Sequence, residues 1–413
     1  MTPSSRRATA GPRRPWSAEP TFTLGTTCSS PPRIPRPTWI ACSKRPARPS
    51  RPWPSRVPVA ELRERLRGAW EGRVSGCQLG KPVELLVHFE GQAGLDAYLE
   101  SAGALPLRDY VPLVEDTLVA RIGRASCRGE LCRSEPDDDI NYTVLALLVL
   151  EDHGLELGTE DVGRAWLRLL PVGATFTAER AAYKIMLDKG HEHFALGAPA
   201  GFDLAACSDH EWNDWIGAQI RADLYGWVCP GRPELAADLA RRDAALSHRG
   251  EGIHGAVFVA SAGAAIAGSA GLAEAVECGL AEIPADSGAA AAVALGREWA
   301  GRSEGGAAIR EQYAELPVVH TLNNLALVVW ALLSHPDDFG AAIGDAVAAG
   351  LDTDCNGATV GGLWGLQGKP VPEAWTDPWR ERIAVNLAGV GELRLGELVE
   401  RTAKVAEQIA KQR

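Results

Sequence analysis

Three consecutive carboxylates form the first place in this sequence where residue type and spacing suggest chemistry. Asp137, Asp138 and Asp139 follow a proline and precede an apolar segment. The dipole and the free N–H groups of a helix N-terminus favour an aspartate by about 0.3–1 kcal/mol. That effect explains one or two of the three, but three adjacent negative charges repel one another unless something positive offsets them. A helix cap and a metal or catalytic site therefore both remain open.

A second acidic loop, residues 350–357, repeats this design. Asp352 and Asp354 precede another apolar segment, and Cys355 follows them directly. Carboxylate oxygens are preferred ligands of Mg²⁺ and Mn²⁺, so two such loops that meet in space would form a site for these ions. The twelve-residue pattern of a calcium EF-hand, with its terminal glutamate, is absent from both loops. The pair of loops thus favours a magnesium or manganese site.

Other polar residues could bind a substrate. Arg221 could hold a pyrophosphate through two parallel hydrogen bonds, although a surface ion pair explains it equally well. His248 could contact a substrate or serve as a hydrogen-bonded structural histidine. Residues 320–324, His-Thr-Leu-Asn-Asn, either cap the apolar helix that follows or provide a ligand.

Composition and missing motifs exclude several classes of protein. A net charge of −11 argues against nonspecific binding of a nucleic-acid backbone. The nine cysteines include no repeated CxxC pairs, so we expect reduced, cytoplasmic thiols rather than a disulfide framework or a structural zinc site. The sequence contains no GxSxG elbow, Walker A loop or GxGxxG fingerprint. It also lacks a secretory signal and an apolar run long enough to cross a membrane.

Helices must position these candidate residues. Only 6% of the residues are aromatic, whereas Ala, Leu and Gly are abundant, which favours close helix packing over a sheet sandwich. Convincing alternating strands are scarce, with a weak β signal at 383–395. We therefore predict an all-α fold. Helical spacing of apolar residues occurs at 59–70, before a small-residue run from Gly72 to Gly80, and at 143–151, 160–170, 234–246, 253–267, 322–333 and 397–411.

The N-terminal segment differs from the rest of the chain. Residues 1–57 are rich in Pro, Arg and Ser and have no sustained apolar period. We expect this segment to be either disordered or the product of a wrongly assigned start or a frameshift, with a basic nucleic-acid arm as the remaining alternative. Residues 58–413 contain no long linker and no internal repeat, which predicts one compact domain.

Four stretches between about residues 60 and 405 resemble a known family. They are residues 68–84, the Asp-Asp pair with Tyr142 and Thr143 behind it, residues 216–221 followed later by Ser247 and His248, and the loop 350–357. In type and order these stretches resemble the ADP-ribosylglycohydrolase family. Its members include the dinitrogenase-reductase-activating glycohydrolase and the ADP-ribosylarginine and ADP-ribosylserine hydrolases. The resemblance implies an orthogonal all-α helical bundle in one catalytic domain.

The resemblance also implies roles for individual residues. Asp138, Asp139, Asp352 and Asp354 match the family's metal ligands, and Glu84 falls where members place an acidic residue that faces the metals. Two departures affect the metal site. Asp137 stands where many members have Thr, but it can still supply an oxygen to a metal ion. Cys355 stands where many have Thr or Ser, and its neutral thiol is a poor ligand for Mg²⁺ or Mn²⁺, although its position keeps it among the candidate metal-site residues. A third departure places Cys77 where Asp is usual. The implied substrate-binding residues are Gln219, Arg221 and His248.

The family implies a mechanism with two Mg²⁺ or Mn²⁺ ions, which orient ribose hydroxyls and lower the pKa of a water. Asp138 and Asp139 are the candidates for ligand and base, and Glu84 for an assisting carboxylate. The expected reaction is hydrolysis of the N- or O-glycosidic bond of an ADP-ribosyl group on a protein or small molecule, by a monomer. The alternatives are a hydrolase of small ribosides or nucleotides and a non-catalytic ADP-ribose-binding relative.

Overall fold

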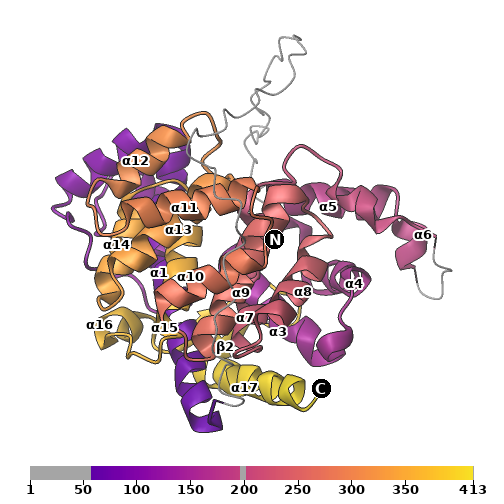
Figure 1. Cartoon of the computed structure of the whole chain (residues 1–413). Coiled ribbons are helices and arrows are strands. Elements are labelled where there is room, and N and C mark those ends of the chain that lie inside the picture. Colours follow the sequence, from indigo (N-terminus) through magenta and orange to yellow (C-terminus); the bar gives the residue numbers. More distant parts are fainter. Residues whose placement is uncertain (1–56, 196–200, 413) are drawn as a thin grey trace, which may run out of the picture. The chain divides into compact units, whose positions relative to one another are not determined.

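The computed structural model describes residues 57–195 and 201–412. Within these ranges the chain forms seventeen α-helices and two three-residue strands (Figure 1), which confirms the predicted all-α fold. The N-terminal segment predicted to be disordered or artefactual lies outside the described residues, except for Val57. That prediction therefore stays untested.

The α-helices begin and end as follows: α1 Val59–Ser101, α2 Leu118–Ile122, α3 Asp138–His153, α4 Thr159–Leu169, α5 Thr177–Asp188, α6 His191–Phe194, α7 Asp223–Trp227, α8 Pro233–Ala244, α9 Gly250–Ala267, α10 Leu272–Ala281, α11 Gly288–Trp299, α12 Gly305–Gln312, α13 Thr321–Ser334, α14 Phe339–Ala348, α15 Thr353–Gly365, α16 Glu373–Thr376 and α17 Leu395–Lys411. Among the short 3₁₀ segments, η5 (Ile216–Arg221) is important for the site. Each range with predicted helical spacing overlaps one of these helices. The weak β signal is confirmed by β1 (Arg382–Ala384) and β2 (Glu392–Arg394), which pair antiparallel with Ile383 opposite Leu393.

Helix α1 is longer than its apolar pattern predicts, because it continues through the small-residue run. Glycines in a helix interior normally weaken it by about 1 kcal/mol each. Here they recur every four residues and therefore lie on one face of α1, where they allow another helix to approach closely. The regular helix is interrupted only at Gly91, where φ is 68°.

The helix that approaches this face is α15, which runs antiparallel to α1. A Cβ atom added to Gly76 would lie 1.9 Å from the carbonyl oxygen of Gly357, and one added to Gly72 would lie 2.0 Å from that of Gly361. No side chain larger than glycine fits these positions without moving the backbone. This contact sets the middle of α1, which carries Lys81 and Glu84, against the loop that precedes α15.

Helix α9 lies at the centre of the second half of the fold and packs against α7, α8 and α10 (Figure 1). Its length and hydropathy would permit it to cross a membrane, and it is the one such helix in the described residues. However, 78% of its apolar window is buried inside the protein. This burial is what a core helix requires, since α9 is apolar on all sides.

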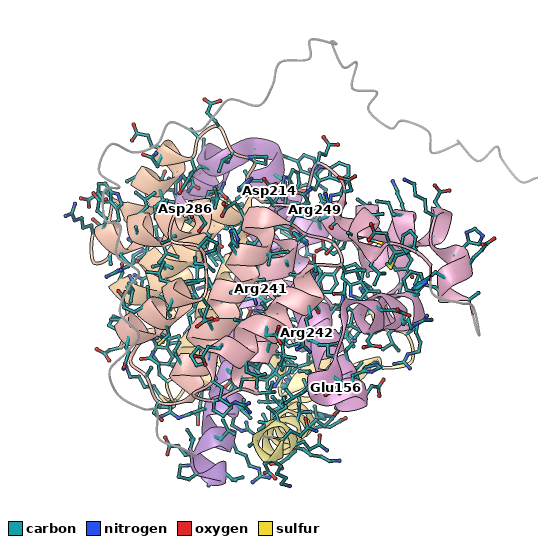
Figure 2. The ribbon with its side chains drawn as sticks, turned by 45° about the vertical axis from the view of Figure 1, so that its right-hand side comes forward. Glu156, Asp214, Arg241, Arg242, Arg249 and Asp286 are labelled. Atoms are coloured by element: carbon teal, nitrogen blue, oxygen red, sulfur yellow. The ribbon has the colours of Figure 1, made fainter. Side chains whose placement is uncertain are left out.

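The start of α9 is also held to the chain that leads into η5. The backbone N–H of Arg249 donates to the carbonyl of Asn213 over 2.8 Å, and Figure 2 shows Asp214 and Arg249 at this end of the helix. Asp214 is in turn 3.3 Å from Nε2 of His320, the residue before α13. These contacts connect α9, η5 and α13 around one side of the candidate site.

Candidate metal centre and active site

The two acidic loops meet in the folded protein. Their ligand atoms form three overlapping groups in which all atoms lie within 4.8 Å of one another. Asp354 belongs to all three groups, so the other carboxylates are arranged around it. The groups are Asp137 with Asp138, Asp139 and Asp354; Asp139 with Asp354 and Cys355; and Glu84 with Asp352 and Asp354. The predicted proximity of the two loops is thereby confirmed.

Asp137 is both a helix cap and half of an ion pair. Its Oδ1 accepts a hydrogen bond from the backbone N–H of Asp139 over 3.1 Å, at the N-terminus of α3. Its Oδ2 lies 2.6 Å from Nζ of Lys81. Burial alone would raise the pKa of Asp137, but the Lys81 ammonium outweighs it, so the pKa is lowered. The helix-cap interpretation is thus correct for this one aspartate.

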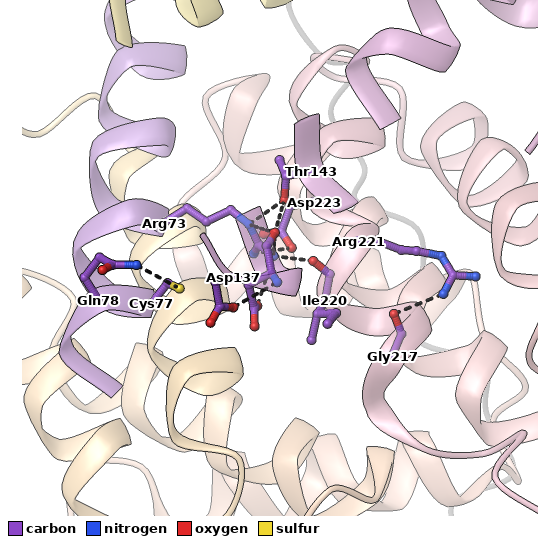
Figure 3. Close-up of polar contacts among 10 residues, drawn as sticks. Arg73, Cys77, Gln78, Asp137, Thr143, Gly217, Ile220, Arg221 and Asp223 are labelled. Atoms are coloured by element: carbon purple, nitrogen blue, oxygen red, sulfur yellow. Dashed lines mark hydrogen bonds and ion pairs between the residues drawn. The ribbon is translucent and has the colours of Figure 1, made fainter. Parts of the chain in front are cut away.

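A buried arginine contacts the last aspartate of the first loop. Nη2 of Arg73 lies 3.1 Å from Oδ1 of Asp139, and Nη1 lies 2.9 Å from Oδ2 of Asp223. Arg73 also donates to Thr143 and to the carbonyl of Ile220 (Figure 3). The second carboxylate oxygen of Asp139 is buried and has no hydrogen-bond partner in the described structure.

The second loop is held by backbone geometry and by an asparagine. Gly350 and Leu351 both adopt positive φ, 77° and 59°, which turns the chain back toward α13. Oδ1 of Asn324 then accepts hydrogen bonds from the backbone N–H of Asp352 (3.1 Å) and from Nδ2 of Asn356 (2.8 Å). His320 caps α13 through Nδ1, which accepts from the N–H of Leu322 over 3.1 Å. Residues 320–324 therefore act as the predicted cap, and they also position the loop.

The cluster holds more negative charge than the protein offsets. It contains six carboxylates, and the basic side chains that contact them in the described structure are Arg73 and Lys81. Burial and the neighbouring carboxylates raise the pKa of Asp354 to about 7. The same causes raise the pKa values of Glu84, Asp138, Asp139 and Asp352 well above their usual range.

The residues present fit divalent cations. Buried oxygens of Asp139, Asp352 and Asp354 have no hydrogen-bond partner among the described residues. Unpaired buried carboxylate oxygens are costly unless a proton or a metal ion binds to them. Two divalent cations would match the charge that the basic side chains leave uncompensated, and the donors are the hard oxygens that Mg²⁺ and Mn²⁺ prefer.

A pocket opens above this cluster. Glu84, Asp138, Asp352 and Cys355 line it from the acidic side. The rest of its lining comes mainly from the segment 172–179, from η5 and from neighbouring residues, and it includes Phe176, Glu179, Trp215, Gly217 and Ile220. Asp139 and Asp354 lie beneath the lining and are buried. The pocket is thus acidic at its base and partly aromatic at its sides.

Arg221 does not form a surface ion pair, and it has no free hydrogen-bond donor. Its side chain is only 2% exposed, so the surface interpretation is wrong. Nε donates to Asp243, Nη1 to Glu179 (2.8 Å) and the carbonyl of Gly217 (3.2 Å), and Nη2 to Asp243 O (3.3 Å) and Ser247 (2.9 Å). All five N–H groups are therefore occupied within the protein, and none is free for a pyrophosphate.

Gln219 and His248 do not reach the pocket either. Both are fully buried, and neither belongs to the pocket lining. Nδ1 of His248 is 2.8 Å from Oγ of Ser247. Burial and the positive charge of Arg221 lower the pKa of His248 well below its usual value, so this histidine is neutral. In this conformation the three predicted substrate-binding residues lie behind the pocket wall.

The cysteines that depart from the family pattern have different surroundings. Cys355 lines the pocket and belongs to a ligand group with Asp139 and Asp354. Cys77 is buried beside Asp137 and belongs to none of the three groups. Seven cysteines lie in the described residues, and all seven are free thiols there, as the sequence predicts.

Several site residues were not identified from the sequence. Lys81 lies within the first family-like stretch, directly after Gly80, so its position in the sequence could have indicated a role in the site. Arg73 gave no such signal, because its partners are remote in sequence. Asn324 was considered only within the cap or ligand at 320–324, and its hydrogen bonds to the second loop were not predicted. Glu179 was also missed, although it lines the pocket.

Comparisons with known proteins identify the family and the fold of this chain. The sequence model of the ADP-ribosylglycohydrolase family matches residues 58–411. A solved structure described as an ADP-ribosylglycohydrolase-related protein complex shares the fold, with a TM-score of 0.53 and 20% identity over 85% of this chain and 99% of the other. No curated protein is significantly similar in sequence. Because the family model matches nearly all of the described chain, this protein belongs to the ADP-ribosylglycohydrolase family.

Proposed function

We propose that this protein hydrolyses the N- or O-glycosidic bond of an ADP-ribosyl group with the help of two divalent cations, Mg²⁺ or Mn²⁺. The observation that carries the proposal is the sharing of Asp354 by three groups of ligand atoms at the base of a pocket. One shared carboxylate between two sets of oxygens is the arrangement expected of a two-metal site. Family membership supports the glycosidic bond as the target.

The two cations would be held by different parts of the cluster. Asp137, Asp138, Asp139 and Asp354 would hold one, with Cys355 beside it, and Glu84, Asp352 and Asp354 would hold the other. Such ions, when bound, orient the hydroxyls of a substrate and lower the pKa of a bound water. The protein's own part is to hold the ligands rigidly through Lys81, Arg73 and Asn324.

Asp138 is the best candidate for the general base. It lines the pocket, is half-buried, and has no basic partner within contact distance in the described structure. Asp139, by contrast, lies beneath the pocket and one of its oxygens contacts Arg73, so we assign it to metal binding alone. Glu84, which lines the acidic side of the pocket, would stabilise positive charge that develops on the ribose as the bond breaks.

Release of ADP-ribose tests this function. The purified protein is given ADP-ribose linked to arginine, serine and nucleic acid, with Mn²⁺, Mg²⁺ or EDTA. We expect turnover of at least one substrate, loss of turnover in EDTA, and a drop of roughly 10²–10⁴-fold in kcat for Asp138→Asn with metal still bound. The matched control is Asp152→Asn at the exposed end of α3. Absence of turnover, or equal rates for Asp138→Asn and wild type, contradicts the proposal.

One observation favours a second candidate, a hydrolase of small ribosides. Among the described lining residues the basic side chains are Lys81, which pairs with Asp137, and His88. A pyrophosphate would therefore find little positive charge in the pocket. Small ribosides belong in the same assay, and turnover of these but of no ADP-ribosyl substrate would select this candidate. A protein that binds no metal and hydrolyses neither would be a non-catalytic relative.

A further inference from the structure

A carboxylate outside the metal cluster also lines the pocket. Glu179, near the start of α5, is 3% exposed and belongs to the pocket lining. Asp138 and Cys355 line the same pocket, so Glu179 shares this pocket with the reacting end of the metal cluster. The mechanism proposed above assigns no role to this residue.

The structure holds this carboxylate in one orientation. Oε1 of Glu179 accepts from Nη1 of Arg221 over 2.8 Å. The carboxylate rests on Gly217, where an added Cβ would lie 2.1 Å from Oε1. The guanidinium of Arg221 is itself fixed, because it lies over the rings of Tyr142 and Trp166 at 5.9 Å and 5.1 Å from their centroids. A side chain held this firmly is suited to recognise a group on a substrate.

The charge around Glu179 determines which kind of substrate group it can bind. Arg221 is shared between two carboxylates, Glu179 and Asp243, so the three side chains together keep one excess negative charge. The basic residues of the lining do not offset it, because Lys81 pairs with Asp137 and burial lowers the pKa of His88. A substrate group that approaches Glu179 must therefore donate hydrogen bonds or carry positive charge, since an anion or a bare acceptor would be repelled.

We propose that Glu179 is a specificity-determining residue that accepts hydrogen bonds from the leaving group. The preferred leaving group is nitrogen-linked and carries N–H donors, as a guanidinium does, rather than oxygen-linked. Arg221 acts as the positioning residue that orients Glu179. This inference rests on the proposed function, because it assumes that the ribose binds at the metal cluster and the leaving group binds near Glu179. It also explains why Arg221 has no donor free for the substrate.

Two matched substrates test the assignment, ADP-ribosyl-arginine and ADP-ribosyl-serine. For Glu179→Gln we expect kcat/KM on the arginine-linked substrate to fall on the order of ten- to a hundredfold, mainly through KM, because a charge-assisted hydrogen bond is weakened. The serine-linked substrate should change by less than about threefold. Glu151→Gln, an exposed residue paired with Arg401, is the control. Equal losses on both substrates, or a wild type that cleaves only the serine-linked one, would overturn the proposal.

A binding measurement separates this inference from the hydrolase function. Calorimetric titration of the Mn²⁺-loaded protein with agmatine, a guanidinium compound without ribose, should give binding in wild type and a loss of at least tenfold in Glu179→Gln. The affinities of the two proteins for free ADP-ribose should differ by less than about threefold, which also shows that the variant is folded. Glu179-dependent agmatine binding without any turnover would refute the hydrolase function alone. Turnover of both substrates with agmatine binding unaffected by the variant would refute the role of Glu179 alone.

If Glu179→Gln does not fold, Glu179→Asp takes its place. Aspartate keeps the negative charge for Arg221 but shortens the side chain by one methylene, so the carboxylate withdraws from the pocket. We expect the same selective rise in KM for the arginine-linked substrate, with kcat changed by less than about threefold. A fall in kcat on both substrates without a change in KM would indicate a purely structural role and overturn the assignment.

Discussion

Two groups of buried charge flank the pocket, and they are built in opposite ways. The acidic side consists of Glu84, Asp137, Asp138, Asp139, Asp352 and Asp354, and the arginine side consists of Glu179, Arg221 and Asp243. On the arginine side every guanidinium N–H has an acceptor within the protein. On the acidic side, buried oxygens of three aspartates have no hydrogen-bond partner within residues 57–195 and 201–412. The arginine side is therefore complete as folded, whereas the acidic side requires a proton or a cation from outside.

The largest effect is expected for Asp354→Asn, because Asp354 belongs to all three ligand groups. Affinity for Mn²⁺ should fall on the order of a hundredfold or more, as measured by calorimetry. In EDTA, however, the variant should be at least as stable as wild type, since the substitution removes charge repulsion. Asp152→Asn serves as the control. A variant that retains normal metal affinity would remove the basis for the two-metal site.

An aspartate-to-asparagine substitution on the arginine side should destabilise the metal-free protein, whereas Asp354→Asn should not. Asp243→Asn leaves the buried guanidinium of Arg221 with one carboxylate instead of two, so the free energy of unfolding in EDTA should decrease by about 3 kcal/mol. Mn²⁺ affinity of the folded variant should be unchanged. Urea unfolding of both variants under one set of conditions makes the comparison. Equal stability changes for Asp243→Asn and Asp354→Asn would mean that the two sides do not differ as described.

A smaller effect is expected on the pH dependence of stability in the metal-free protein. The pKa of Asp354 is about 7 in the folded protein, against 3.8 for an ordinary aspartate, because of burial and nearby carboxylates. The folded state thus binds the proton of Asp354 more tightly than the unfolded state, so the contribution of this residue to stability is present at low pH and is lost as the pH rises through about 7. Relative to Asp354→Asn, the Tm of wild type in EDTA should fall on the order of 5 °C between pH 5 and 7.5.

Saturating Mn²⁺ provides the check on that trend. Bound cations replace the protons, so the difference between the two proteins should reverse in favour of wild type at neutral pH. A difference in Tm that does not depend on pH would show that Asp354 is already ionised in the metal-free protein.

The smallest effect concerns Cys355, the thiol in the ligand group with Asp139 and Asp354. Cys355→Ser replaces a soft sulfur with a hard oxygen, which should raise Mg²⁺ affinity by about three- to tenfold and lower Cd²⁺ affinity. Calorimetric titration with each ion measures both changes. Cys77→Ser is the matched control, because Cys77 lies nearby but outside the ligand groups. Unchanged affinities for Cys355→Ser would show that this side chain does not contact the metal.

Local patterns were sufficient for much of this molecule. The helices follow from apolar spacing, and both acidic loops follow from carboxylates placed before such segments, because these signals act within a few residues. The glycines that recur every fourth residue in α1 were also visible in the sequence, as part of a small-residue run. The family-like stretches identified the carboxylates that the structure brings together, namely Glu84, the three aspartates before α3, and Asp352 and Asp354.

The tertiary structure alone decided which charges are paired. Arg73 contacts Asp139 from 66 residues away, Thr353 donates to the carbonyl of Gly80 across 273 residues, and Asn324 holds a loop 28 residues further on. Sequence spacing contains no information about such contacts. For that reason Arg221 was assigned to the substrate, whereas it holds Glu179, which was not recognised. A charged residue binds a ligand only if the fold leaves its hydrogen-bonding groups unoccupied, and that depends on packing between distant segments.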